Sequence, residues 1–325
     1  MVSGRVPLTI HHSTTHYSTT HHSPMNDFLA YWNGSFVPQS QVRLAINDAG
    51  FVFGATATDM CRTFRHRLFR LEDHVRRFEQ SCRLAQVPQP SPTEQLKTIA
   101  DELVKRNSPL LSRTDDLALV MFATPGEIGY YLGLPGGIAE ATPTLCMHTF
   151  PLPFARYRRL MTDGARLVTV SSSTAASLVP PAIKQRSRLH WWLAEQQAHD
   201  VDAAASALLL DENGHVTETA AANFLLVRDG KIWSPKRDHI LGGISLLVVE
   251  ELCGELGIDF VEADLPLADC LQAEAAMLSS TPFCLAPVAS INGRALACPG
   301  PVYGRLLAAW NAMVGVDIRR QIEVG

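Results

Sequence analysis

The sequence of 325 residues lacks an excess of either charge and is short of lysine. It contains 28 Lys plus Arg against 32 Asp plus Glu, a net charge of −4, and only five of the basic residues are lysines. A near-neutral balance indicates no basic surface of the kind that binds nucleic acid. No apolar run approaches the roughly 20 residues that span a bilayer. We therefore expect a protein with small-molecule partners that acts on neither nucleic acid nor membranes.

Cysteine usage excludes two further classes of protein. The seven cysteines include no CxxC pair, and their spacings are long. An odd number of widely spaced cysteines argues against a disulfide framework and against a zinc site, so we expect no metal. The same pattern suits a reducing compartment and predicts a cytoplasmic protein.

The first 24 residues are polar and rich in His, Thr and Ser, without the continuous apolar core of a signal peptide. For residues 1–24 we expect a disordered leader, or an extension upstream of a start at Met25, in preference to a metal-binding tract. The remaining chain mixes strand-like and helix-like patterns in both halves, which predicts two α/β or α+β domains. We place a small N-terminal domain at 25–150, a proline-marked connector at 151–157 and a large C-terminal domain at 158–325.

Periodicity places the main elements. Residues 28–38 predict two strands joined at Asn33-Gly34, and 206–235 predict successive strands with Asn-Gly and Asp-Gly turns. Helical spacing of apolar residues predicts helices within 72–87 and 187–203, and another helix that opens directly after Gly242-Gly243.

One of the five lysines stands out from the others. Lys97 and Lys105 belong to the polar face of a predicted helix, and Lys231 and Lys236 lie in turns or loops, so all four are explained as surface charges. Lys184 instead follows an apolar, proline-bounded run. A lysine in an apolar site loses basicity and becomes an amine nucleophile for carbonyl compounds. An exposed loop lysine fits the local sequence equally well.

Three other features favour the nucleophile. Glu218 lies within an otherwise apolar strand pair, although a carboxylate on an edge strand is the simpler explanation for it alone. Ile244 and Ser245 occupy the first turn of a helix, where backbone N–H groups and a hydroxyl form an anion site, unless the serine is only a cap. Ser280 and Thr281 offer a second turn of small residues. An amine, a carboxylate and an anion pocket together describe a pyridoxal 5'-phosphate site.

Four motifs in this order carry a resemblance to a known family: "AIKQRSRL", "LLLDENGHVTETAAANF", "ILGGIS" and "LSSTPFCLAPV". The chain resembles the class IV, fold type IV pyridoxal phosphate enzymes from about Tyr31 to about Ala309. That family includes branched-chain aminotransferases, D-amino acid aminotransferases and aminodeoxychorismate lyases. The resemblance implies an α/β two-domain fold with a smaller N-terminal and a larger C-terminal domain, the cofactor between them, and a homodimer.

The resemblance also implies roles for individual residues. Lys184 would be the catalytic residue, forming the Schiff base with the cofactor and moving a proton, and Glu218 would pair with the pyridine nitrogen. Asn223 matches an asparagine with a structural role. The remaining implied cofactor contacts are those to the phosphate, from Arg77, Ile244, Ser245 and Thr281, and that of Leu241 with the ring.

Departures from the family pattern fall on the groups that recognise substrate. Pro125 replaces an arginine of the D-amino acid enzymes and lyases, and Phe51 replaces a tyrosine of the D-specific enzymes. Pro282 removes an N–H from the turn at Thr281, and Leu189 replaces a tyrosine of the branched-chain enzymes. Phe51, Arg188 and Pro282 are nevertheless the positions predicted to face substrate. Arg43, Arg186 or Arg188 is available to bind the carboxylate of the substrate in place of the missing groups. Otherwise the substrate is an amine without an α-carboxylate.

The predicted function is therefore a transaminase that moves an amino group between an amino acid or amine and a 2-oxo acid. Two alternatives stay open at this point. One is a lyase of the aminodeoxychorismate type, supported by the "VTExxAAN" pattern and by Arg188, four residues after the lysine. The other is a cofactor-binding protein with little catalysis.

Overall fold

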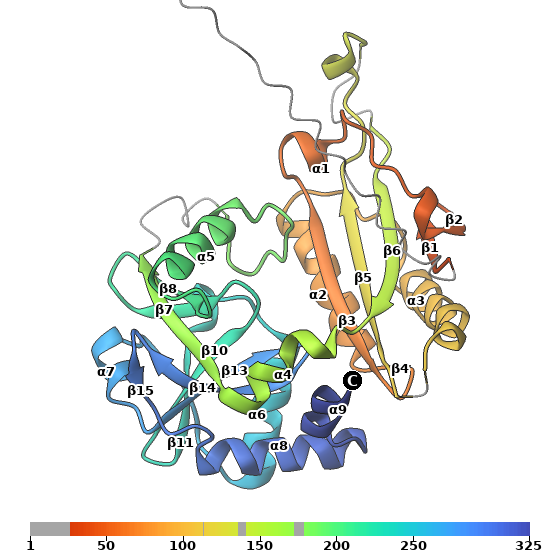
Figure 1. The fold of residues 1–325 in the computed structure, drawn as a ribbon. Coiled ribbons are helices and arrows are strands. Elements are labelled where there is room, and N and C mark those ends of the chain that lie inside the picture. Colours follow the sequence, from red (N-terminus) through yellow and green to blue (C-terminus); the bar gives the residue numbers. More distant parts are fainter. Residues whose placement is uncertain (1–26, 113, 136–140, 172–178) are drawn as a thin grey trace, which may run out of the picture.

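The computed structural model describes residues 27–112, 114–135, 141–171 and 179–325. The predicted leader at 1–24 lies outside these residues. Figure 1 shows two β-sheets, each with its own helices, and the short helix at the C-terminal end of the chain between them.

The first sheet is antiparallel and has the strand order β2-β1-β6-β5-β3-β4. Its strands are β1 (Leu29–Trp32), β2 (Ser35–Pro38), β3 (Ala57–Phe64), β4 (Arg67–Leu68), β5 (Leu117–Thr124) and β6 (Thr144–Pro151). Its helices are α1 (Ala49–Val52), α2 (Leu71–Leu84) and α3 (Thr93–Asn107).

Local sequence explains how this sheet forms. Asn33 and Gly34 both have positive φ, 44° and 99°, which is the geometry that a two-residue hairpin turn between β1 and β2 requires. Helices α2 and α3 bury their apolar stripes against one face of the sheet, in a core that contains Phe78, Leu103 and Met121. The hairpin and α2 agree with the predicted elements.

The second sheet has nine strands in the order β12-β11-β10-β13-β14-β7-β8-β9, with β15 beside β14. Its strands are β7 (Ala165–Ser171), β8 (Ser206–Leu210), β9 (Val216–Thr219), β10 (Asn223–Arg228), β11 (Lys231–Pro235), β12 (Phe260–Ala263), β13 (Ala275–Ser280), β14 (Cys284–Ile291) and β15 (Arg294–Ala295). The helices of this half are α4 (Phe154–Asp163), α5 (Leu189–Val201), α6 (Ile244–Leu256), α7 (Leu267–Leu271), α8 (Pro301–Val314) and α9 (Ile318–Val324). Short 3-10 helices occupy Gln39–Gln41, Ser108–Leu110, Gly129–Leu132 and Arg237–His239.

The second sheet closes on itself at one pair of residues. Strand β9 pairs with β8 and also with β10, where Asn223 lies opposite Glu218. The strands from β10 through β13, β14, β7 and β8 to β9 therefore form a ring. Glu218 and Asn223 are neighbours across this closure because the backbone register puts them there.

A buried network joins the two halves. Arg62 on β3 is 1% exposed; one guanidinium nitrogen donates to the Pro282 carbonyl oxygen at 3.0 Å, and another donates to Gln321 Oε1 on α9 at 2.9 Å. Gln321 in turn donates to Asp116 at 2.8 Å. The first sheet, the C-terminal helix and the turn after β13 are thereby held in one arrangement.

The division into two domains remains a prediction. The predicted connector at 151–157 contains the last residue of β6 and the beginning of α4, so part of it is helical. Within the described residues, no helix combines the length and the apolar character needed to cross a membrane.

Candidate active site

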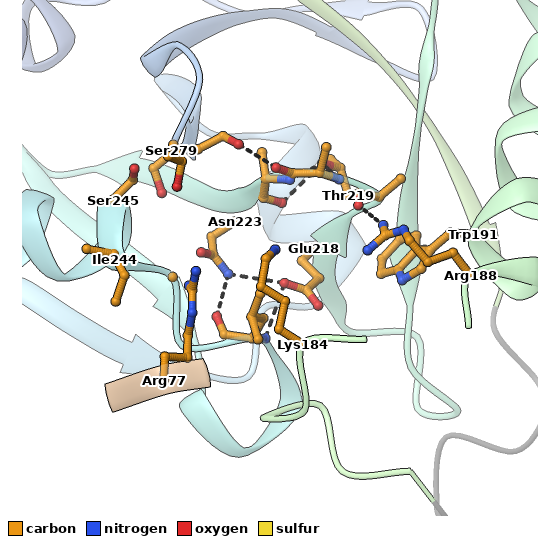
Figure 2. A pocket seen from close by; sticks show the side chains of 17 residues that line it. Arg77, Lys184, Arg188, Trp191, Glu218, Thr219, Asn223, Ile244, Ser245 and Ser279 are labelled. Carbon is orange, nitrogen blue, oxygen red and sulfur yellow. Dashed lines mark hydrogen bonds between the residues drawn. The ribbon is translucent and has the colours of Figure 1, made fainter. Parts of the chain in front are cut away.

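A pocket lies where α2, the Lys184 loop and the second sheet meet (Figure 2). It encloses about 470 Å³ of empty space, part of it open to solvent. Its wall is made by Arg77, Lys184, Arg188, Trp191, the segment Glu218–Asn223, Leu241, Gly243, Ile244, Ser245, Ser279, Ser280 and Thr281. The predicted cofactor residues Arg77, Lys184, Glu218, Leu241, Ile244, Ser245 and Thr281 all belong to this wall.

Lys184 differs from the other lysines in its partners. The side-chain amines of Lys97, Lys105, Lys231 and Lys236 each form an ion pair with a carboxylate. Among the described residues, no hydrogen bond or ion pair occupies the Lys184 Nζ. The amine is therefore available to a ligand in the pocket.

The loop that carries Lys184 is anchored to the first half of the chain. The Lys184 N–H donates to Ser81 Oγ on α2 at 3.1 Å, and its carbonyl oxygen accepts from the Thr58 N–H on β3 at 2.8 Å. Two residues later the Arg186 N–H donates to Thr56 Oγ1 at 2.8 Å. These bonds fix the backbone, and with it the point from which the lysine side chain starts into the pocket.

Burial of the amine lowers the pKa of Lys184 from 10.5 to about 8. Desolvation is the main cause, and the nearby positive charge of Arg77 adds to it, while the negative charge of Asp59 opposes it. A substantial fraction of the amine is therefore neutral near pH 8. Only the neutral amine is a nucleophile and a proton acceptor.

Glu218 is held by two donors from the neighbouring strand and loop. Its Oε2 accepts from Asn223 Nδ2 at 3.1 Å and from the Leu241 N–H at 3.2 Å. Asn223 Nδ2 also donates to the Leu241 carbonyl oxygen at 2.8 Å, which locks the amide in place. Burial raises the pKa of Glu218 to about 7, so near neutral pH this carboxyl group is able to share a proton with a basic ring nitrogen.

Arg77 owes its position to a buried carboxylate behind it. Asp59 on β3 is fully buried and accepts from Arg77 Nε at 2.7 Å and Nη2 at 2.9 Å. His74 Nδ1 lies 2.7 Å from the same carboxylate. The third guanidinium nitrogen, Nη1, donates to the Gly242 carbonyl oxygen at 3.0 Å. The side chain is thus tied both to β3 and to the loop before α6.

The side of the pocket that carries Arg77 suits an anion. Gly243 is the N-cap of α6 and no side chain caps this end, so the first N–H groups of the helix, at Ile244 and Ser245, are open to a ligand. The Ser279 side chain is buried, and its Oγ has no hydrogen-bond partner among the described residues. A buried hydroxyl without a partner is costly, and a ligand oxygen at this place would satisfy it.

These groups fit pyridoxal 5'-phosphate. The helix N-terminus, Arg77 and the serine hydroxyls suit a phosphate, Glu218 suits a pyridine nitrogen, and Lys184 suits an aldehyde. The orphaned Ser279 hydroxyl is the independent observation in favour of an oxygen-rich ligand, because the protein alone leaves it unsatisfied.

The three residues predicted to face substrate differ in whether they line the pocket. Arg188 lines the pocket, whereas Phe51 and Pro282 do not. Phe51 is 70% exposed, and the carbonyl oxygen of buried Pro282 accepts from Arg62, away from the pocket.

Sequence reasoning missed Asp59, Ser279 and Trp191. A carboxylate inside a short strand-like run of uncharged residues, 57–61, was a signal for Asp59, comparable to the one used for Glu218. Ser279 directly precedes the two residues that were considered, Ser280 and Thr281. Trp191 follows from Arg188 by one turn of helix, which brings both side chains to one face.

The family model described as "Amino-transferase class IV" matches residues 56–291. Among relatives, a Methanocaldococcus jannaschii protein with a provisional name as a branched-chain-amino-acid aminotransferase is 28% identical, over 82% of this chain and 88% of its own length. A D-alanine aminotransferase from Bacillus licheniformis is 26% identical, over 83% and 92%.

Solved structures point the same way. The T.th. branched-chain amino acid aminotransferase, complexed with N-(5'-phosphopyridoxyl)-L-glutamate, has a TM-score of 0.77 and 25% identity, covering 89% of this chain and 95% of its own. The fold IV-transaminase of Curtobacterium pusillum has a TM-score of 0.71 at 19% identity, covering 84% and 92%, and supports the fold alone.

Proposed function

This chain belongs to the class IV aminotransferase family and is a transaminase, and from that premise we propose that pyridoxal 5'-phosphate binds in the Lys184 pocket. The enzyme moves an amino group in two half-reactions, from an amino donor to the cofactor and from there to a 2-oxo acid. One observation carries the assignment of the site. Lys184, the lysine without a carboxylate partner, shares a pocket with Glu218 and with the open N-terminus of α6.

When bound, the cofactor supplies an aldehyde that takes the amino group and a ring that accepts electrons from the substrate Cα. The protein does the rest. Lys184 Nζ, in its neutral form, takes the proton from Cα and returns it. Glu218, fixed by Asn223, holds a proton at the ring nitrogen. Arg77, Ser245, Ser279 and Thr281 bind the phosphate, and Leu241 packs on the ring.

We also propose a homodimer and a cytoplasmic location. Exposed aromatic side chains gather at Phe53, Tyr130 and Tyr131, with the Phe53 and Tyr131 ring centroids 5.8 Å apart, and on α5 at Trp192. Such a concentration suits a protein interface. All seven cysteines are free thiols and six are buried, which suits a reducing compartment. A solution mass near twice 35.6 kDa is expected, and a monomer at micromolar concentration contradicts the dimer.

The reaction is tested with purified protein, an amino donor and no acceptor. A transaminase converts its cofactor once, from the aldehyde form to the amine form, and the visible band of the aldehyde disappears with release of one equivalent of oxo product. Adding a 2-oxo acid restores the band. Donors are screened across L- and D-amino acids and simple amines; an unchanged spectrum with the whole panel contradicts the proposed function.

The attachment point is tested separately with Lys184→Ala. The variant is expected to fold, because the Nζ makes no contact that stabilises the chain, and to lose the linkage that borohydride traps. Lys231→Ala, which removes a surface ion pair with Asp259, is the matched control and keeps that linkage. Trapping at the wild-type level in Lys184→Ala places the cofactor on another lysine.

A further inference from the structure

One guanidinium in the pocket wall has no carboxylate partner. Arg188 lines the pocket together with Lys184 and Glu218. Its Nη2 donates to the Ala220 carbonyl oxygen, and its guanidinium lies over the Trp191 ring, 5.7 Å from the centroid. In the described part of the chain no Asp or Glu lies within ion-pair distance of it. Since arginine carries five N–H donors, several remain for a ligand.

The charges around the pocket leave this group without an ion pair, because Glu218 and Glu195 act on it only from beyond ion-pair distance. Arg77 is neutralised from behind by Asp59, and Lys184 interacts with Glu218. Arg188 also precedes α5 directly, as its N-cap, and α5 has no acidic residue in its first turn and no side-chain cap. A positive side chain at a helix N-terminus adds to the positive end of the helix dipole. This corner of the pocket therefore attracts an anion.

The orientation of Arg188 is set by its two contacts. The bond to Ala220 ties one edge of the guanidinium to the turn after β9, and Trp191 supports its plane. Figure 2 shows Arg188 and Trp191 together on the far side of Glu218 from Arg77. A planar fork held in this way is suited to bidentate binding of a carboxylate. It is separate from the groups that suit a phosphate.

The two other candidate arginines are engaged elsewhere. Arg43 donates from Nη1 to the carbonyl oxygens of Ser40 and Val42, at 2.6 Å and 2.8 Å, within its own turn. Arg186 packs over the Phe122 ring at 4.7 Å, and neither residue lines the pocket. Arg188 is thus the arginine that the fold brings into the site.

We propose that Arg188 binds the carboxylate of the substrate, so that this transaminase acts on amino acids and oxo acids in preference to amines that lack a carboxylate. The proposal rests on the proposed function. It assigns carboxylate recognition to the loop that carries Lys184.

The test compares donors that differ only in the carboxylate. The holoenzyme reacts with L- or D-leucine and with 3-methylbutylamine, and with L- or D-alanine and ethylamine, and the rate of cofactor conversion gives kcat/KM for each half-reaction. Arg188→Gln is expected to lower kcat/KM about 10- to 100-fold for the amino acids, the size expected for a lost charge-assisted pair, and to leave the amines unchanged. Arg188→Lys keeps the charge but loses the bidentate geometry of the guanidinium. Its kcat/KM for the amino acids is expected to lie between those of the wild type and Arg188→Gln.

Arg186→Gln is the matched control, because it removes the same charge two residues away and outside the pocket wall. It leaves the ratio between amino acids and amines unchanged. An equal loss for both donor types in Arg188→Gln shows that Arg188 only holds the loop, and overturns the proposal. A larger effect of Arg186→Gln on the ratio overturns it as well.

A binding measurement decides the question without turnover. The dissociation constant of 4-methylvalerate for the holoenzyme is measured by calorimetry, and Arg188→Gln is expected to raise it about 10- to 100-fold. An unchanged constant overturns the proposal. If no donor of either type converts the cofactor, the transaminase function fails, and this titration still decides whether Arg188 binds carboxylates.

Discussion

The carboxylate of Asp59 accepts two hydrogen bonds from Arg77, from Nε to Oδ2 at 2.7 Å and from Nη2 to Oδ1 at 2.9 Å. The two residues are 18 positions apart, on β3 and α2, and both are buried. The pair turns a helix arginine that reads as a surface charge in the sequence into a fixed part of the pocket wall. The pKa of Asp59 is held below its usual range by Arg77 and His74, which outweigh the effect of burial.

Asp59→Asn is expected to damage both stability and cofactor binding. The substitution leaves the Arg77 charge buried without its partner, which typically costs about 3–5 kcal/mol of unfolding free energy. Denaturant unfolding of the cofactor-free protein and titration with pyridoxal phosphate measure the two effects. Asp101→Asn, at an exposed position on α3, is the control and changes stability by less than about 0.5 kcal/mol. Wild-type cofactor affinity in Asp59→Asn removes Asp59 from the site.

Two adjacent glycines are predicted to behave differently. A Cβ on Gly243 would lie 2.0 Å from Asn223 Oδ1, whereas a Cβ on Gly242 meets no atom within 4 Å. Gly243 has φ −67° and ψ 136°, which alanine also adopts, so only the clash matters. Gly243→Ala displaces Asn223 and with it a hydrogen bond of Glu218, and both cofactor affinity and turnover fall.

Gly242→Ala keeps cofactor affinity near that of the unaltered protein. Cofactor titration and thermal unfolding of both variants check the pair. Equal behaviour of the two variants contradicts the role given to Asn223.

The pH dependence of cofactor attachment follows from Lys184. Because the pKa of this amine is about 8, the rate at which cofactor-free protein reacts with pyridoxal phosphate is expected to rise through pH 8 and then level off. The unfolded chain keeps a proton on the amine up to about pH 10.5, so the free energy of unfolding also rises between these two values. Stopped-flow absorbance against pH measures the first effect. If the rate of cofactor attachment instead has its pH midpoint near 10.5, the amine is not desolvated.

Glu218 makes the free energy of unfolding change with pH in the opposite direction, and at lower pH. Its pKa is raised from 4.5 to about 7, so between these values the folded carboxyl group holds a proton that the unfolded one has lost. The free energy of unfolding of the cofactor-free protein therefore falls as pH rises through this window. Glu218→Gln is expected to remove that part of the slope.

Denaturant unfolding at about pH 5 and about pH 8 measures the change in slope. Glu212→Gln, at an exposed turn position, is the control and leaves the slope as it is. If Glu218→Gln and Glu212→Gln give the same slope, Glu218 is already ionised in the folded protein at the lower pH.

The residues expected to take part in the chemistry, Lys184 and Glu218, could be predicted from the sequence. Four of the five lysines were explained as surface charges, and these four do form ion pairs with carboxylates. Lys184 was left open between an exposed loop lysine and a nucleophile. The strand and helix around Glu218 and Ser245 were also readable, because apolar periodicity and Asn-Gly, Asp-Gly and Gly-Gly signals are local properties of the chain. These features predicted the parts of the pocket wall at the start of α6 and at the end of β13.

Which polar groups meet depends on how distant parts of the chain pack together. Asp59 lies behind Arg77, Ser81 anchors the Lys184 backbone, and Arg188 rather than Arg43 or Arg186 enters the pocket. These contacts depend on strand register and on how α2 and the Lys184 loop pack against two sheets, across separations of 18 to 103 residues. Local pattern says which residues are buried, but it carries no information about which distant partner each buried polar group finds.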